Sequence, residues 1–235
     1  MPRILVFGAS GKTGREIVSQ ALARGWQVAA VVRDPAKLGI RHERLVALTG
    51  DMADRASLDR AMHGSAGSAE SGGSARSGAA AQAPFDAVVS ALGVYSKEPT
   101  TALSEGTRDI VGAMQQAGLR RIVIVSSLGA GDSHGQGSFP VRLIQRFILK
   151  QVLIDKTRQE EILRSSGLEW TSLRPPQLTD APTIRGDLIT WSGPVQPTQR
   201  LNWKVTRASV ARYVLDAFEQ RRWIGEAVCL AEPAK

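Results

Sequence analysis

The sequence predicts an α/β fold in which helices cover both faces of a doubly wound, mostly parallel sheet. Short runs of β-branched and apolar residues alternate with helical patterns along the chain, and the first several runs are almost entirely apolar. Parallel strands with helices on both faces show such runs, because neither face meets water. The helices between them supply right-handed crossovers. A chain of 235 residues with 43% hydrophobic content is expected to form one domain, 1–235.

The expected elements follow one another in a regular order. Strands are predicted at 3–7, 27–32, 45–48, 85–91, 121–126, 169–173 and 227–230. Helices are predicted at 13–24, 55–62, 101–117, 141–165 and 208–219, the fourth of them broken. Loops on the substrate side are expected at about 174–206, before the last helix.

Residues 64–83 interrupt this alternation. They include five Gly, five Ser and seven Ala and show no apolar periodicity. Such a segment buries too little surface to offset its ordering entropy, so we expect a flexible insertion, with a short alanine helix at 79–83 as the alternative.

A glycine-rich turn follows the first strand and leads directly into a helical pattern. Its three glycines allow a tight bend, close approach of a pyrophosphate to the backbone, and close packing of the helix on the strand. The pattern therefore predicts a dinucleotide site; the alternative is a tight turn that binds nothing. The cofactor-binding residues expected in this turn are Gly8, Ser10, Gly11, Lys12, Thr13 and Gly14.

The same letters resemble the end of a P-loop, in which a lysine reaches the terminal phosphates of a nucleoside triphosphate. A P-loop has a glycine five residues before its Gly-Lys pair, whereas Val6 stands at that position here. The spacing therefore excludes a P-loop, and Lys12 becomes an ordinary loop residue near phosphate.

The end of the second strand predicts the type of cofactor. An acidic residue there accepts from the ribose of NAD, whereas an arginine favours the 2'-phosphate of NADP. Arg33 follows the strand directly, with Lys37 as further support, and arginine binds phosphate strongly in a bidentate geometry. We therefore expect NADP(H). The alternative is that Asp34 binds the ribose and Arg33 faces solvent.

Further cofactor contacts are expected where the third and fourth strands end. Asp51 and Met52 are expected near the adenine. Ala91, Leu92 and Gly93 would bring small residues and backbone against the nicotinamide half.

Charge and cysteine usage narrow the classes of partner. The net charge is +8, and the segments 139–164 and 185–222 together account for +7 of it. A basic surface suits nucleic acid, an anionic membrane or a phosphate-bearing ligand, but no nucleic-acid motif is present, so no nucleic-acid partner is expected. Cys229 is the only cysteine and is expected to be buried in a strand, which excludes an internal disulfide.

No metal site and no membrane insertion are expected. The three histidines, His42, His63 and His134, lie far apart without ligand spacing. No apolar stretch reaches membrane-spanning length, and little room for a signal peptide precedes the first strand, so a cytoplasmic location is expected.

These features resemble the atypical short-chain dehydrogenases of the NmrA-like, NAD(P)H-binding group, which have a Rossmann-type fold. The resembling segments are 8–14, 32–34, 50–51, 99–101, 104–107, 125–127, 166–168 and 174–176. Within the group the resemblance is strongest to NADPH-dependent flavin reductase (biliverdin reductase B), over nearly the whole chain except 64–83 and about 130–150. It implies hydride transfer from NADPH to a planar acceptor such as a flavin or quinone, by a monomer or homodimer.

The resemblance also assigns residues. Ser127 matches the active-site serine, whose hydroxyl would orient the nicotinamide amide or bond the acceptor; otherwise it only satisfies backbone. Ser126 and Pro175 would contact the cofactor, and Pro176 and Gln177 would border the substrate.

The chain departs from the family in its proton donor. Dehydrogenases of the Tyr-x-x-x-Lys type lower the tyrosine pKa with the lysine, but Val152 stands four residues before Lys156. Lys156, Glu160 and Gln177 occupy the positions of the flavin reductase's histidines, which argues against bilin reduction. Lys156 is expected to form a weak surface ion pair with Glu160. The alternative function is a regulatory protein that binds NADP(H) and a protein partner without turnover, and a nucleotide-sugar epimerase is a weaker third.

Two further segments leave their roles open. Residues 139–153 predict a basic amphipathic helix, which suits a membrane surface but is explained more simply by packing on the sheet, a substrate lid or a dimer contact. Trp191 and Trp203 flank a polar loop that would either cover the acceptor or anchor itself to the surface.

Overall fold

The computed structural model describes residues 1–64, 85–94, 96 and 98–234. The strands are β1 (Arg3–Phe7), β2 (Gln27–Val32), β3 (Leu45–Thr49), β4 (Ala87–Ser90), β5 (Arg121–Val125), β6 (Glu169–Arg174), β7 (Gln177–Thr179), β8 (Ile189–Ser192), β9 (Leu201–Asn202), β10 (Lys204–Thr206) and β11 (Glu226–Pro233). The α-helices are α1 (Lys12–Ala23), α2 (Arg55–Met62), α3 (Ala102–Gln116), α4 (Phe139–Phe147), α5 (Lys150–Ser165) and α6 (Arg207–Glu219). Short 3-10 turns lie at η1 (Pro35–Lys37) and η2 (Gly131–Ser133).

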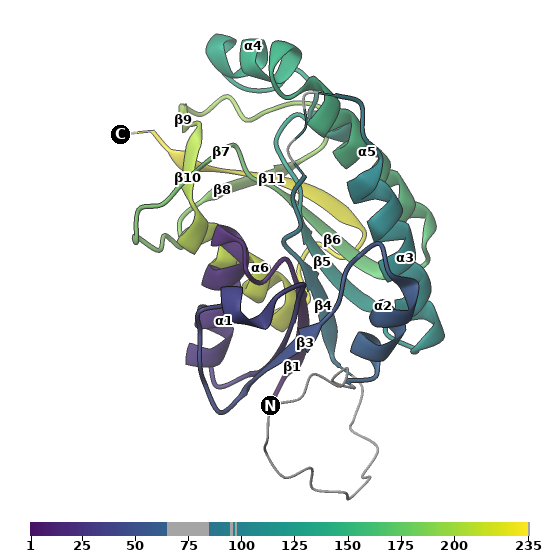
Figure 1. Cartoon of the computed structure of the whole chain (residues 1–235). Helices are drawn as coiled ribbons and strands as arrows, with labels where there is room; N and C mark the ends of the chain where they lie inside the picture. The colour runs from purple at the N-terminus through teal and green to yellow at the C-terminus, as the bar shows by residue number, and fades with distance from the viewer. Residues whose placement is uncertain (65–84, 95, 97, 235) are drawn as a thin grey trace, which may run out of the picture.

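The sheet has the predicted doubly wound topology. Its strands follow the order β3-β2-β1-β4-β5-β6-β11-β8, with β9 also paired to β11. All neighbours pair in parallel except β8 and β9, which both run antiparallel to β11. The chain winds outward from β1 in one direction and from β4 in the other (Figure 1). The crevice between the carboxyl ends of β1 and β4 is therefore the switch point, where such sheets bind ligands.

Two hydrophobic cores lie on the two faces of the sheet. Ile4 and Val6 of β1 join the core that includes α1 and α6. Leu5 and Phe7 point the other way, into the core that includes α2, α3 and Leu163 of α5. Because successive strand residues alternate between faces, an apolar run in β1 fills both cores at once. The apolar strand pattern in the sequence is thereby explained.

The predicted strands and helices are present, with ends shifted by a few residues. The helix expected at 141–165 is broken as predicted, between α4 and α5. The segment expected to consist of loops, about 174–206, contains four short strands, of which β7 and β10 form a separate parallel pair. The insertion expected at 64–83 lies outside the described residues after Gly64. No helix among the described residues is long and apolar enough to span a membrane.

Candidate functional site

The glycine turn after β1 packs so closely that its glycines leave no room for a side chain. Gly8 has φ +74°, and a Cβ there would lie 2.8 Å from the backbone carbonyl of Ala91 on the neighbouring strand end. A Cβ on Gly14 would lie 2.1 Å from the Gly8 carbonyl oxygen, which also accepts a 3.0 Å hydrogen bond from the Gly11 amide. The turn, the start of α1 and the end of β4 are therefore packed backbone to backbone.

The start of α1 is built to receive an anion. Gly11 is the N-cap residue, and no side chain caps the first turn of the helix. The unpaired amides and the positive end of the helix dipole attract phosphate in such a position. The glycine cradle and the uncapped helix together fit a dinucleotide pyrophosphate.

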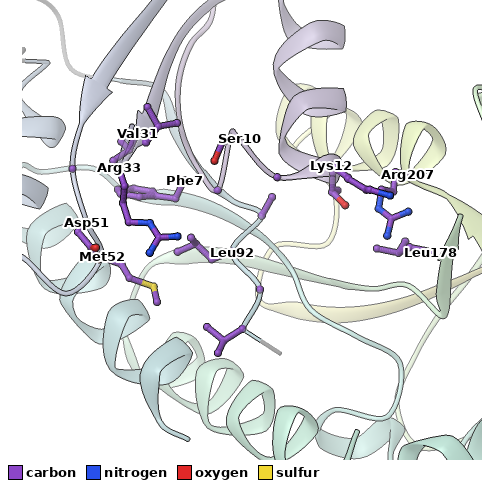
Figure 2. A pocket seen from close by; sticks show the side chains of 18 residues that line it. Phe7, Ser10, Lys12, Val31, Arg33, Asp51, Met52, Leu92, Leu178 and Arg207 are labelled. Carbon is purple, nitrogen blue, oxygen red and sulfur yellow. The ribbon is translucent and has the colours of Figure 1, made fainter. Parts of the chain in front are cut away.

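A pocket of about 550 Å³ opens over this turn (Figure 2). Eleven of the predicted cofactor residues line it: Gly8, Ser10, Gly11, Lys12, Thr13, Arg33, Asp51, Met52, Ala91, Leu92 and Gly93. The sequence reasoning missed the lining residues Phe7, Val31, Val32, Gly50, Val94, Leu178 and Arg207. Several of these residues lie at strand ends beside predicted residues, so their position at a strand end could have predicted them. Leu178 and Arg207 come from the C-terminal region, where no sequence pattern predicts a contact with the pocket.

The predicted adenine end of the pocket holds Arg33, Asp51 and Met52. Figure 2 shows the Arg33 side chain extending into the pocket on the side of Asp51 and Met52. Asp34 points its carboxylate at the Ala36 amide (3.0 Å) as the cap of η1, and Lys37 lies 3.9 Å from it rather than on the pocket wall. The structure thus brings Arg33 to the pocket and leaves Lys37 outside its lining.

A carboxylate from the C-terminal region bridges two cations of the site. Asp180 lies 2.6 Å from the Lys12 ammonium and also pairs with Arg207 at the start of α6. The two cations hold the pKa of Asp180 below its usual value. Asp180 therefore joins the first turn of α1 to α6, a contact that the sequence analysis did not predict.

Two buried hydroxyls lie at the ends of the central strands. Ser90 ends β4 and Ser126 follows β5, and the Oγ atom of each is buried without a hydrogen-bond partner among the described residues. Neither serine lines the pocket over the glycine turn. Ser127, the predicted catalytic residue, is half-buried and donates its hydroxyl to the Leu128 carbonyl at 3.3 Å.

Lys156 lies beneath this strand end, inside the protein. It is 7% exposed, and its ammonium donates to the Val125 carbonyl at 3.2 Å. Burial lowers the pKa of Lys156 to about 8, although Glu160 and Asp155 oppose the shift. The predicted weak surface pair between Lys156 and Glu160 is therefore wrong, because both side chains are buried and Glu160 binds elsewhere.

Glu160 forms a buried ion pair with Arg174, which is 0% exposed. Arg174 approaches the two Glu160 oxygens at 3.0 and 2.5 Å, and Ser172 donates to the same carboxylate at 2.7 Å. Arg174 also pairs with Asp132 in η2. This network joins β6 and α5 to the loop that follows Ser127.

The loop after β5 is also tied to the C-terminal strands. The Leu128 amide donates to the Pro175 carbonyl at 2.9 Å, and Trp191 of β8 donates to the Gln136 side chain at 2.9 Å. Trp191 packs edge to face on Trp203. The two tryptophans therefore contact each other, and Trp191 also binds the loop after β5.

The remaining predicted residues lie away from the pocket lining. Gly14 acts through packing, Ser126, Pro175 and Pro176 are buried, and Gln177 is exposed at the start of β7. Cys229 is buried in β11 as predicted, and burial raises the pKa of its thiol to about 11. The described part of the chain contains no group of three or more His, Cys, Asp or Glu side chains that could hold a metal ion.

Known proteins are similar to this chain in sequence or in fold. A (4-alkanoyl-5-oxo-2,5-dihydrofuran-3-yl)methyl phosphate reductase from Streptomyces griseus is 27% identical over 80% of this chain, which spans only 50% of that protein's length. The solved structure of ChuY, an anaerobillin reductase from Escherichia coli O157:H7, superposes with a TM-score of 0.72 at 24% identity, covering 99% of this chain and 98% of ChuY. A short-chain dehydrogenase/reductase from Veillonella parvula, solved in complex with NADP, gives 0.74 at 17% identity over 99% and 95% of the two chains.

The family assignment comes from the sequence itself. A model of the NAD(P)H-binding family matches residues 8–221, from the first glycine of the turn to the residues just after α6. The match covers the strand ends that line the pocket, and it confirms the expectation of a nicotinamide dinucleotide cofactor. The chain belongs to the NAD(P)H-binding family.

Proposed function

We propose that this protein is an NADPH-dependent reductase that transfers a hydride to a planar acceptor such as a flavin or quinone. The observation that supports it most directly is the pocket at the switch point, with an uncapped glycine turn in its middle and Arg33 at one end. The glycine turn suits the pyrophosphate, and the Arg33 guanidinium suits the 2'-phosphate that distinguishes NADPH from NADH.

In this proposal the chain's own residues position the cofactor and the acceptor, and none of them reacts chemically. When bound, the nicotinamide supplies the hydride. Ser127 follows β5 and lies outside the pocket lining; by the family resemblance its hydroxyl, which now donates to the Leu128 carbonyl, would orient the ring amide or the acceptor. Lys156 fixes the same strand end through the Val125 carbonyl. Asp180, Lys12 and Arg207 hold the C-terminal region against the turn.

The polar groups of the site favour an acceptor that takes its proton from water. Val152 stands where a Tyr-x-x-x-Lys enzyme has its proton donor, and Tyr213, the one tyrosine in the described part of the chain, is buried with its hydroxyl on the Gly186 carbonyl and the Leu188 amide. A flavin or quinone meets this condition: it accepts the hydride from NADPH and a proton from solvent, giving NADP⁺ and the dihydro acceptor. The names of the Streptomyces and ChuY relatives support a reductase in general.

Parallel turnover assays test the proposal. Purified protein is given NADPH with FMN, riboflavin, a soluble quinone or biliverdin, and NADPH oxidation is followed by absorbance while cofactor binding is measured by calorimetry. We expect turnover with the flavins or the quinone, and little with biliverdin. Tight NADPH binding without turnover on any acceptor would overturn the reductase and favour the alternative, a regulatory protein that senses NADP(H).

The cofactor preference is tested by reversing the charge at one position. Arg33→Glu should weaken NADPH binding about 10- to 100-fold, because a charge-assisted contact to phosphate is replaced by repulsion. NADH lacks this phosphate, so its dissociation constant should change little. Arg41→Glu, at an exposed position outside the pocket lining, is the matched control. An equal loss for both cofactors in Arg33→Glu would refute the assignment.

A further inference from the structure

Helix α4 turns its apolar side outward. Figure 1 shows it at one end of the molecule, beyond the sheet and next to α5. Six of the eleven large hydrophobic side chains that are exposed among the described residues lie in 139–154. The exposed fractions are 69% for Phe139, 49% for Leu143, 45% for Ile144, 71% for Phe147 and 50% for Ile148. Such a cluster indicates an interaction surface rather than scattered exposure.

The buried position of α4 is polar, and its exposed apolar side chains border an open groove of about 1350 Å³ between α4, α5 and the loop after β5 rather than the packed core. Gln145 is the one buried residue of α4. Its side-chain amide donates to the Gln136 carbonyl at 3.1 Å and to the Leu128 carbonyl at 3.4 Å. These hydrogen bonds hold the helix with Gln145 inside and the phenylalanines outside. The exposure is therefore built into the way that α4 is attached.

The charge around this face is uniformly positive. Residues 133–154 contain no Asp or Glu, while Arg142, Arg146 and Lys150 are all exposed. The Arg146 guanidinium lies 5.7 Å from the Phe147 ring centroid, so a cation and an apolar anchor are adjacent. Apolar side chains interleaved with cations are complementary to a surface that has an anionic outer layer over an apolar interior.

We propose that α4 docks on an anionic lipid surface, with its phenylalanines in the acyl boundary and its cations on the headgroup phosphates. A helix of this composition lies in the plane of the interface. With nine residues, about 14 Å, α4 is too short to cross the bilayer. A second copy of the chain fits this face less well, because pairing α4 with α4 would bring the same three cations of each copy together. This inference does not depend on the proposed reductase activity.

Vesicle co-sedimentation tests the proposal, using the full chain and phosphatidylcholine vesicles with or without about 30% phosphatidylglycerol. We expect the wild type to sediment with the anionic vesicles at low salt, to be released by high salt, and to ignore the neutral vesicles. Phe139→Ser with Phe147→Ser should lower partitioning at least tenfold, because two apolar anchors are lost. Arg142→Gln, Arg146→Gln and Lys150→Gln combined should lower it about 100-fold.

Controls separate docking from general effects of charge and exposure. Val195→Ser removes an apolar side chain that is 77% exposed on another part of the surface, and Arg41→Gln removes a distant cation; neither should change partitioning. The substituted side chains Phe139, Arg142, Arg146 and Phe147 of α4 and Lys150 of α5 are all exposed, so circular dichroism should show an unchanged fold. Absence of wild-type co-sedimentation, equal binding to both vesicles, or a wild-type dimer that dissociates on Phe147→Ser would overturn the proposal.

Discussion

Helices α4 and α5 are consecutive in the chain, yet each reverses what is usually buried. Helix α4 exposes its large apolar residues and buries Gln145. Helix α5 begins three residues after α4 ends and, beside Leu153 and Leu163, buries the charged and amide side chains of Asp155, Lys156, Gln159 and Glu160. One helix faces outward with apolar groups, and the next faces inward with polar ones.

The difference shows that the available partner decides burial. The Asp155 carboxylate accepts from the Leu103 and Ser104 amides at 3.0 and 3.2 Å, and so caps α3 from another helix. The Gln159 side chain donates to Thr107 at 2.8 Å. Buried polar groups are tolerated when they find such partners, although the Gln159 side-chain oxygen has none among the described residues. The apolar side chains of α4 instead border an open groove beside α5 and remain exposed.

The largest effect is expected from breaking the buried ion pair of α5. Glu160→Leu leaves Arg174 buried with only Asp132 to compensate its charge, so the free energy of unfolding should fall by about 3 to 5 kcal/mol. Urea unfolding followed by fluorescence measures it. Glu161→Gln, at the exposed next position, should change it by less than about 0.5 kcal/mol.

A double variant shows whether the pair itself or its disruption matters. Glu160→Leu combined with Arg174→Met removes both charges and should recover most of the loss, because a buried pair roughly balances its desolvation cost. A Glu160→Leu protein as stable as the wild type would mean that water reaches Arg174. The guanidinium of Arg174 would then not be buried beneath α5, in contradiction to the structure.

A smaller effect is expected from Lys156, and it depends on pH. Its pKa is lowered from 10.5 in the unfolded chain to about 8 in the folded protein, so at neutral pH the folded state bears the cost of a buried charge. Between about 8 and 10.5 the unfolded state binds the extra proton, and this residue's contribution makes stability rise with pH. Lys156→Met should be the more stable protein at pH 7, and its advantage should shrink over that range.

The control for Lys156 is a lysine at the surface. Lys150 is exposed at the start of α5, so Lys150→Met should change the free energy of unfolding by less than about 0.5 kcal/mol. A wild type and a Lys156→Met variant whose stabilities differ by a constant amount from pH 7 to 10.5 would contradict the lowered pKa.

The cofactor half of the molecule could be predicted from sequence because its determinants are local. Gly8, Gly11 and Gly14 act within one turn, and Arg33 follows its strand directly, so pattern and spacing suffice. Eleven predicted residues meet in one pocket for that reason. The parallel order of the sheet likewise follows from the alternation of apolar runs and helices.

The rest could not be predicted because its determinants are contacts between distant segments. Asp180 reaches Lys12 across 168 positions, and Trp191 reaches Gln136 across 55. The spacing of Lys156 and Glu160 predicts a surface pair, yet the helix turns both inward toward Val125 and Arg174. A helical pattern shows which side chains share a face but not what that face meets.

The smallest effect on stability is expected on α4, and it completes the comparison. Phe147→Ser removes a large apolar side chain that is 71% exposed, so the free energy of unfolding should change by less than about 0.5 kcal/mol. Leu163→Ala on α5, where the side chain is 0% exposed, should cost about 2 to 5 kcal/mol. Both are read by urea unfolding without lipid. If Phe147→Ser lowers the free energy of unfolding as much as Leu163→Ala does, the apolar side of α4 is already covered in solution. The two helices would then not differ in the burial of their apolar side chains.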